Sequence, residues 1–193
     1  MKDKVILVDC DGVLLDWVHP FKQWMNKLGY IFQEQYDYKY DMHIGYGLSK
    51  YDMKKLIRFF NESAQIRFLP PLRDAIHYVS KLHREHGYVF HCITSLSTDE
   101  NTTILRTKNL QELFGKTVFE KIVYLDCGAN KDDALEKYVN SGCIWVEDKV
   151  ENAELGLKLG LDSILITHNH NNNHSPGIKR MFNWKEIYSY IAY

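Results

Sequence analysis

The chain has 193 residues, of which 45% are hydrophobic and 25% are charged, as is typical of a globular protein. Its 24 basic and 25 acidic side chains give a net charge of −1, so composition offers no general attraction to nucleic acid or to a membrane surface. No apolar run approaches the length of a membrane span. We expect a cytoplasmic protein without a signal peptide, whose four cysteines are reduced because they show no C-x-x-C spacing.

The first predicted strand covers residues 4–9 and ends in a pair of carboxylates. The run Val5–Val8 is apolar and mostly β-branched, which is typical of a buried strand. Asp9 and Asp11 follow, and their spacing places both side chains on the same side of an extended backbone. Like charges this close repel unless a cation or a shared proton relieves them. The pair therefore indicates a Mg²⁺ site, a nucleophile with a proton donor, or both.

Residues 10–87 separate the first predicted strand from the second, although a crossover between parallel strands needs only a dozen or so residues. The excess has its own helical periodicity, and a helix between Leu72 and Leu82 then returns the chain to the sheet. We therefore expect a small helical cap over residues 16–70. The remaining residues, 1–15 and 71–193, form the predicted core.

Strands and helices alternate along the rest of the chain. Further strands are predicted at residues 88–94, 121–126, 143–147 and 163–167, with helices around residues 104–114, 134–139, 150–157 and 184–190. This alternation predicts an α/β fold, a Rossmann-like parallel sheet flanked by helices, with the cap inserted after the first strand. Ligands bind such sheets beyond the carboxyl ends of the strands, so the cap is expected to lie over the site.

Polar residues stand at or after the ends of three later strands. Thr94 and Ser95 offer hydroxyls and backbone N–H groups that suit phosphate oxygens. Lys131 stands at a predicted helix start, where its charge and the helix N-terminus attract a phosphate. Asp148, after the fourth strand, completes a Mg²⁺ site begun by Asp9. Each signal alone is ordinary in a loop, on a surface or at a helix cap, but their order along successive strands indicates one site.

This order of motifs resembles the haloacid dehalogenase-like (HAD) superfamily, in its helical-cap type, over nearly the whole chain. The resemblance implies a phosphatase in which Asp9 attacks phosphorus to form an aspartyl-phosphate. Asp11 would protonate the leaving oxygen and then deprotonate the water that hydrolyses the intermediate. The Asp9 carboxylate, the Asp11 backbone carbonyl and Asp148 would hold Mg²⁺ as the cofactor.

The resemblance also implies a phosphate-binding set, made of Thr94, Ser95 and Lys131. The Thr94-Ser95 pair is similar to the 5′(3′)-deoxyribonucleotidase branch. It implies a 5′-nucleotidase whose small-molecule phosphate ester is a (deoxy)nucleoside monophosphate. The alternatives are a small-metabolite phosphatase acting on a sugar phosphate or a phosphoglycolate-like ester, a nucleic-acid end phosphatase, and a non-catalytic HAD-like binding module. We expect a monomer or a homodimer, and the net charge argues against extended nucleic-acid binding.

Aromatic residues are frequent in the predicted cap. Trp17, Phe21 and Tyr46 are candidates for contact with the substrate, because aromatic rings can stack on a nucleobase. The alternative is that these rings fill the interior of a small helical unit. Further along the chain, residues 168–174 are rich in Asn and His, and we interpret them as a polar loop after the last predicted strand rather than as a metal site.

Overall fold

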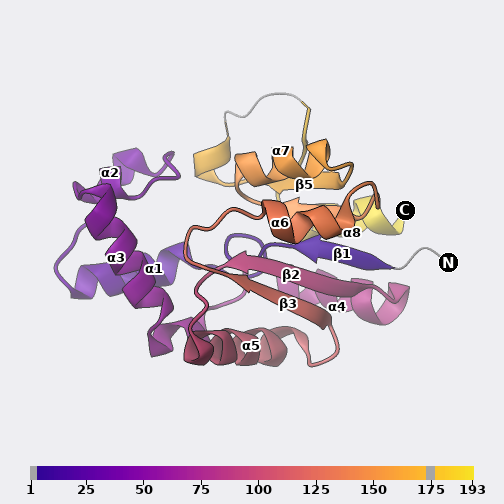
Figure 1. The fold of residues 1–193 in the computed structure, drawn as a ribbon, viewed down its shortest axis with the longest axis horizontal. Coiled ribbons are helices and arrows are strands. Elements are labelled where there is room, and N and C mark those ends of the chain that lie inside the picture. The colour runs from indigo at the N-terminus through magenta and orange to yellow at the C-terminus, as the bar shows by residue number, and fades with distance from the viewer. Residues whose placement is uncertain (1–3, 173–176) are drawn as a thin grey trace.

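The computed structural model describes residues 4–172 and 177–193, and its centre is a parallel β-sheet (Figure 1). The strands are β1 (Val5–Val8), β2 (Val89–Ser95), β3 (Phe119–Leu125), β4 (Ile144–Glu147), β5 (Asp162–Ile166) and β6 (Lys179–Met181). They follow one another across the sheet in the order β3-β2-β1-β4-β5-β6, and all neighbours are parallel. The predicted fold class, a Rossmann-like α/β sheet, is confirmed.

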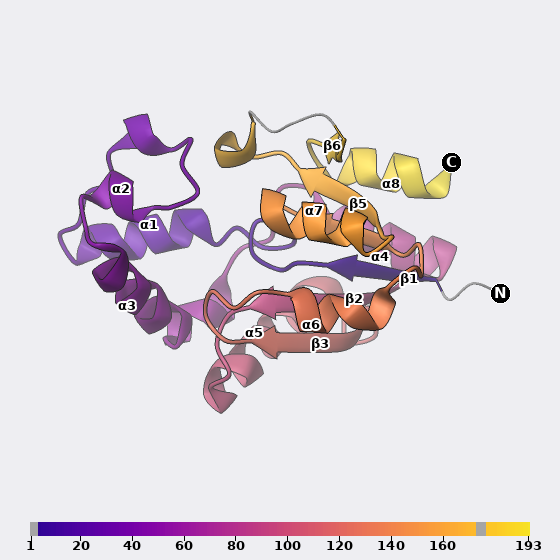
Figure 2. The ribbon, with the colours of Figure 1, turned by 45° about the horizontal axis from the view of Figure 1, so that its top comes forward.

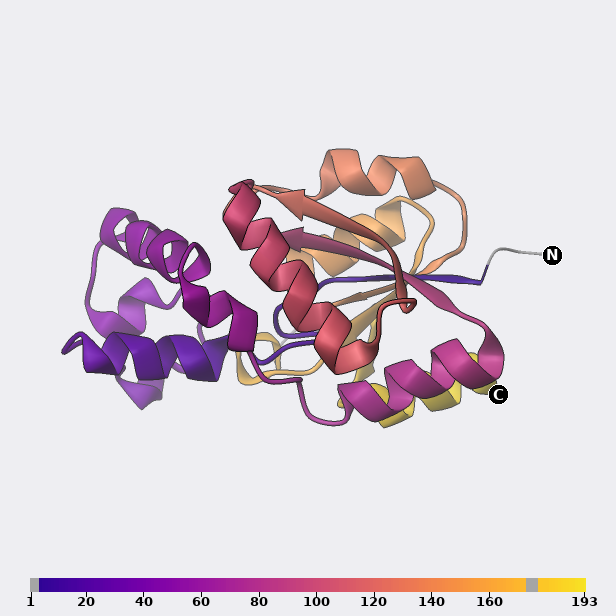
Figure 3. The ribbon, with the colours of Figure 1, turned by 90° about the horizontal axis from the view of Figure 1, so that it is seen from below.

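Helices cover both faces of this sheet (Figure 3). One layer consists of α4 (Ala75–His86), α5 (Glu100–Phe114) and α8 (Trp184–Ala192), and the other of α6 (Asp132–Leu135) and α7 (Val150–Lys158). Side chains alternate along β1 between two cores. Ile6 and Val8 belong to the core beneath α4, α5 and α8, whereas Leu7 packs with Leu135 and Trp145 on the α6 side. The sheet is therefore buried on both faces, as the continuous apolar run of β1 predicts.

Three further helices lie beyond the carboxyl ends of the strands (Figures 1 and 2). They are α1 (Val18–Lys27), α2 (His43–Tyr46) and α3 (Lys50–Asn61). Their interior is built around the buried rings of Phe21 and Phe60, whose centroids are 5.3 Å apart. These helices fall inside the segment predicted as a cap. The division into a cap of residues 16–70 and a core remains a prediction.

Two elements differ from the expectation. The strand β6 was not predicted, because it has only three residues and two of them, Lys179 and Arg180, are charged. The helix predicted around residues 134–139 ends at Leu135 and continues as a 3-10 turn, Glu136–Tyr138. Short 3-10 turns also occur at Glu34–Tyr36, Ala64–Phe68 and Asn169–Asn171. None of the helices in residues 4–172 and 177–193 has the length and apolarity needed to cross a membrane.

Candidate active site

The carboxyl ends of β1 and β4 and the start of α6 bring charged side chains together. The Lys131 ammonium lies 2.7 Å from Asp9 Oδ1 and 2.8 Å from Glu147 Oε2. Lys131 is only 2% exposed, so this cation is effectively inside the protein. The order of the strands along the chain alone predicts that Lys131 lies near Asp9. The structure shows that the two side chains are in direct contact.

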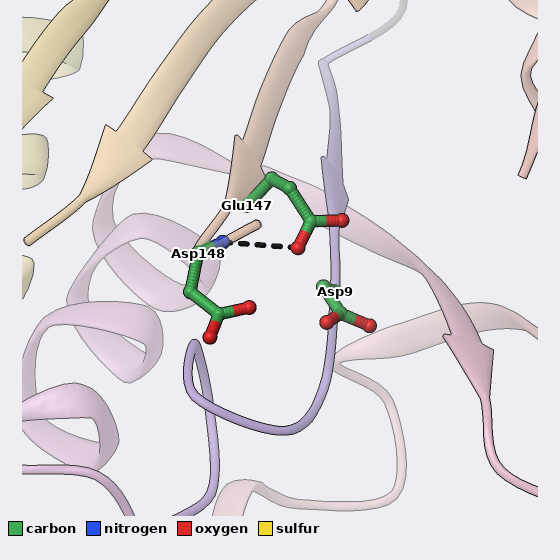
Figure 4. A group of neighbouring side chains, drawn as sticks. All are labelled: Asp9, Glu147 and Asp148. Atoms are coloured by element: carbon green, nitrogen blue, oxygen red, sulfur yellow. Dashed lines mark hydrogen bonds between the residues drawn. The ribbon is translucent and has the colours of Figure 1, made fainter. Parts of the chain in front are cut away.

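Glu147 is saturated by hydrogen bonds, as Figure 4 shows in part. Its Oε1 accepts the backbone N–H groups of Asp148 and Lys149, each at 3.0 Å. Its Oε2 accepts Lys131 Nζ at 2.8 Å and Asn152 Nδ2 at 3.0 Å. With four donors on two oxygens, Glu147 has little capacity left for a metal ion. It acts instead as a fixed anion that positions the lysine and the following loop.

Asp148 lies against the turn that follows Asp9. Gly12 has a φ of +77°, and a Cβ at that position would lie 2.4 Å from Asp148 Oδ2. Only glycine combines this backbone conformation with so close an approach. From the opposite side, Asn171 Nδ2 donates to the Asp148 carbonyl at 2.8 Å, and His170 Nε2 lies 3.4 Å from Asp148 Oδ2. Asp148 is thus held between two loops, with its carboxylate beside that of Asp9 (Figure 4).

The electrostatics of the cluster suit the binding of a divalent cation. Burial raises the pKa of Asp9 well above its ordinary value, although Lys131 opposes the shift. Burial also raises the pKa of Asp148 to about 6, against the effect of His170. Oxygen atoms of Asp9, Glu147 and Asp148 lie within 4.8 Å of one another, and among the described residues Lys131 contacts Asp9 and Glu147 while His170 lies beside Asp148. Hard carboxylate oxygens at this spacing suit Mg²⁺, which relieves their repulsion.

Asp11 does not join this carboxylate cluster. Its two oxygens face Arg106 on α5, with Oδ1 at 2.7 Å from Nη1 and Oδ2 at 3.3 Å from Nη2. The Asp11 side chain is 25% exposed and still lines the cavity in front of Asp9. Asp9 and Asp11 therefore contact different buried cations, although they stand two residues apart in the sequence.

The predicted phosphate-binding residues lie at the same edge. Thr94 and Ser95 end β2, and both line the cavity together with Lys131. Thr94 is 1% exposed, so its position is fixed by the sheet. Ser95 Oγ donates to the Ala129 carbonyl at 2.8 Å, which ties β2 to the loop that carries Lys131. The three residues are thus brought together, with Ser95 also serving to hold that loop.

A cavity of about 450 Å³ extends from Asp9 toward α1 and α3. Of the three aromatic candidates, only Trp17 lines it, and Trp17 Nε1 is held by Asn61 Oδ1 at 2.9 Å. Phe21 is fully buried and Tyr46 is 9% exposed, and they pack against each other inside the helical segment. We correct the expectation for these two rings, because they fill the interior and do not face the cavity.

Two other aromatic residues of the same segment line the cavity instead. Phe32 and Tyr40 both belong to its wall. The Tyr40 ring meets the His170 ring edge-on, with centroids 5.2 Å apart. Tyr40 is 52% exposed, yet desolvation of its hydroxyl and the nearby Asp148 carboxylate raise its pKa well above its ordinary value. A second hollow, of about 530 Å³ between α4 and α5, contains none of the predicted site residues.

Three further residues contribute to the site, namely Arg106, which the sequence does not point to, and His168 and His170 of the predicted polar loop. Arg106 stands in the middle of a helix, where an isolated cation normally indicates a solvated face. His168 Nε2 donates to the Gly12 carbonyl at 2.7 Å, and the two histidine rings stack at 5.4 Å. The segment 168–174 is predicted as a polar loop; His170 of this segment lines the cavity, while His168 and Asn171 contact Gly12 and Asp148 behind it. Asn173 and His174 lie outside the described residues.

No protein-family model matches the sequence. Among curated proteins it is similar to the uncharacterized 32.4 kDa protein in the Gp30-rIII intergenic region of Enterobacteria phage T4. The two are 24% identical over 200 residues, which cover 94% of this chain and 67% of the phage protein. Because the phage protein is described as uncharacterized, this similarity indicates no activity.

Solved structures resemble the chain over nearly its whole length. A hydrolase of the haloacid dehalogenase-like family from Streptococcus pneumoniae has a TM-score of 0.66 at 16% identity, covering 98% of this chain and 99% of its own. CbbY from Rhodobacter sphaeroides, in complex with phosphate, has a TM-score of 0.61 at 16% identity, with 96% of each chain covered. YfnB from Bacillus subtilis, bound to magnesium, has a TM-score of 0.59 at 14% identity, with both chains fully covered.

Proposed function

We propose that this chain, which has the haloacid dehalogenase-like fold, is a Mg²⁺-dependent phosphomonoesterase with an aspartyl-phosphate intermediate. One observation supports this most strongly. The buried Lys131 contacts both Asp9 and Glu147, and Asp148 stands beside them at the carboxyl ends of neighbouring strands. A nucleophilic carboxylate, a fixed cation and a further acid are the parts that phosphoryl transfer requires, because its catalysis consists mainly of positioning and charge neutralisation.

The protein side chains divide the reaction between them. An Asp9 oxygen attacks phosphorus while the bond to the leaving oxygen breaks, and Asp11 gives that oxygen a proton. Asp11 then takes a proton from water, which attacks the aspartyl-phosphate and releases inorganic phosphate and free Asp9. Lys131 reduces the repulsion between Asp9 and the incoming anion, and Thr94 and Ser95 bind the phosphoryl oxygens.

The metal would be held by Asp9, Asp148 and the Asp11 backbone carbonyl. These donors fit Mg²⁺, since all are oxygens and two are buried carboxylates with raised pKa values. When bound, Mg²⁺ supplies positive charge to the phosphoryl oxygens. Glu147 is the less suitable ligand because its oxygens already accept four hydrogen bonds.

For the substrate we propose a nucleoside monophosphate, in agreement with the expectation of a 5′-nucleotidase. The cavity has the volume of an ordinary small-molecule site, and the rings of Trp17, Phe32 and Tyr40 form part of its wall. Flat aromatic walls favour a planar base. A sugar phosphate is the second candidate, because Lys22, Asp37 and other polar side chains of the same wall suit hydroxyl groups.

Phosphate release tests the proposal. The wild-type protein with Mg²⁺ is expected to hydrolyse p-nitrophenyl phosphate, and Asp9→Asn to abolish that activity. The exposed Asp133, substituted in the same way, serves as the matched control. A wild type that releases no phosphate from any ester over a range of Mg²⁺ concentrations refutes the reaction. Comparison of kcat/KM for nucleoside monophosphates and sugar phosphates then decides the substrate, and equal, poor rates on both classes reject the nucleotidase assignment.

A further inference from the structure

The most unusual side chain in the described core is Arg106. It is 0% exposed, although it carries a full positive charge in the interior of an α/β protein. Its Nη1 donates to Asp11 Oδ1 at 2.7 Å and to Cys10 Sγ at 2.8 Å, and its Nη2 donates to Asp11 Oδ2 at 3.3 Å. Its Nε has no hydrogen-bond partner among the described residues. One carboxylate, that of Asp11, provides the compensating charge within contact distance.

Such a residue is a poor stabilising element. A buried ion pair is often no better for stability than apolar side chains of the same volume, because desolvation offsets the attraction. The unpaired Nε adds a further penalty of about 1–3 kcal/mol. Helix α5 could present an aliphatic residue to the same core at lower cost. The arrangement is therefore better explained by what Arg106 does to Asp11.

The contact fixes the direction of the Asp11 carboxylate. A guanidinium presents its donors in a rigid fork, so two parallel contacts determine both the position and the plane of the carboxylate. Arg106 itself cannot move easily, because it is enclosed by the core. It also donates a hydrogen bond to Cys10, which stands two residues beyond the end of β1. Asp11 nevertheless remains partly exposed to the cavity. One side of its carboxyl group is thus held by Arg106 while the other is open to a ligand.

We propose that Arg106 is the positioning residue for Asp11. It holds the Asp11 carboxyl group at the cavity wall, where that group gives a proton to the leaving oxygen and later takes one from the attacking water. This inference rests on the proposed function. It extends to this site a general arrangement, in which a catalytic acid or base is oriented by a third group that does not touch the substrate. Arg106 acts only through Asp11, so its loss should impair proton transfer and leave phosphate binding largely intact.

The test compares substrates that differ only in how much their leaving group needs a proton. Nitrophenolate departs from p-nitrophenyl phosphate without protonation, whereas phenyl phosphate depends on a general acid. Because kcat/KM covers only the steps up to departure of the leaving group, the later hydrolysis of the aspartyl-phosphate does not obscure the comparison. Wild type, Arg106→Met and Arg106→Lys are measured on both esters, with Arg67→Met as the control. Arg67, in the 3-10 turn Ala64–Phe68, pairs with Glu112 of α5, the helix that also carries Arg106.

For Arg106→Met we expect kcat/KM on phenyl phosphate to fall by about 100-fold or more, the scale of general acid catalysis, and on p-nitrophenyl phosphate by less than about 10-fold. Arg106→Lys keeps the charge but loses the forked donor geometry, so its loss of kcat/KM on phenyl phosphate should lie between those of wild type and Arg106→Met. Arg67→Met should leave the ratio of kcat/KM on the two esters unchanged. Equal losses on the two esters, an unchanged Arg106→Met enzyme, or failure of both Arg106 variants to fold would each overturn the inference and assign Arg106 a structural role. Only an inactive wild type would instead refute the proposed function.

Discussion

Replacing Glu147 by Gln tests whether this residue is a fixed anion that organises the site. The side chain is fully buried, and its two oxygens accept four hydrogen bonds. Glutamine keeps one oxygen, which can still accept the backbone N–H groups of Asp148 and Lys149. Its amide nitrogen then faces Lys131 Nζ and Asn152 Nδ2, which are themselves donors. Two hydrogen bonds are lost, and both are charge-assisted because the Glu147 carboxylate is ionised.

The size of the effect follows from those two bonds. The bonds from the Lys131 ammonium and from Asn152 Nδ2 both end on an ionised carboxylate, so each contributes about 1.5–3 kcal/mol. We therefore expect the free energy of unfolding to fall by about 3–6 kcal/mol. For a chain of this length that corresponds to a decrease in Tm of about 6–24 °C. The pKa of Glu147 is lowered in spite of its burial, chiefly by Lys131, which agrees with a stabilising ionised form.

Urea unfolding monitored by tryptophan fluorescence measures the change. The exposed Glu136, substituted to Gln, is the matched control and should alter stability by less than about 0.5 kcal/mol. A second variant, Asn152→Asp, offers an acceptor to the new amide, so in combination with Glu147→Gln it should recover about 1–2 kcal/mol relative to the sum of the single changes. A loss below about 1 kcal/mol for Glu147→Gln, or strict additivity of the pair, would contradict this account of the site.

Three further changes test neighbouring parts of the site. Lys131→Met leaves buried carboxylates without their cation, so the metal-free protein should lose about 3–5 kcal/mol, and MgCl₂ should raise its Tm more than that of wild type; equal shifts in thermal melts would argue against the metal site. Gly12→Ala should lose more stability than Gly47→Ala by at least about 1 kcal/mol, because both have positive φ but only the Cβ at position 12 meets Asp148; equal losses in urea would show that the contact is unimportant. Burial lowers the pKa of His168 from 6.5 to about 4, with help from a neighbouring histidine, so the unfolded chain binds the extra proton first and stability falls as pH decreases through that interval. Relative to His168→Gln, the free energy of unfolding of wild type should therefore fall by at most about 2–3 kcal/mol between pH 7 and pH 4.5. If the free energies of unfolding of the two proteins change in parallel with pH, the lowered pKa is refuted.

The site residues that sequence order alone could bring together stand at strand ends or in the loop that follows one. Asp9, Thr94, Lys131 and Asp148 could be placed together because parallel strands share one carboxyl edge, whatever the details of the helices between them. The positions of these side chains therefore depend on strand order, which the alternation of strands and helices indicates. No knowledge of side-chain packing was needed to bring them to one cavity.

Residues whose role depends on packing were not predictable in the same way. Arg106 lies in α5 between apolar positions, and a cation there is normally assigned to solvent until the helix is docked against β1. Phe21 and Tyr46 could not be distinguished from Phe32 by composition, because all are aromatic residues of one segment. Which rings fill an interior and which face a cavity is decided by the packing of α1 to α3, and local periodicity does not contain that information.

The repulsion expected between Asp9 and Asp11 from their spacing in the sequence is relieved in the structure by two different cations. Lys131 compensates Asp9 from the α6 side, and Arg106 compensates Asp11 from α5. Since each cation is buried and contacts only one member of the pair, the two carboxylates are held in different environments and turned in different directions. A nucleophile and a proton donor require such a difference, because two equivalent carboxylates would compete for one cation and one orientation. Among the described residues, the ion-pair partner of Asp148 is His170 alone, and in the proposed site a divalent cation would relieve the charge that remains there.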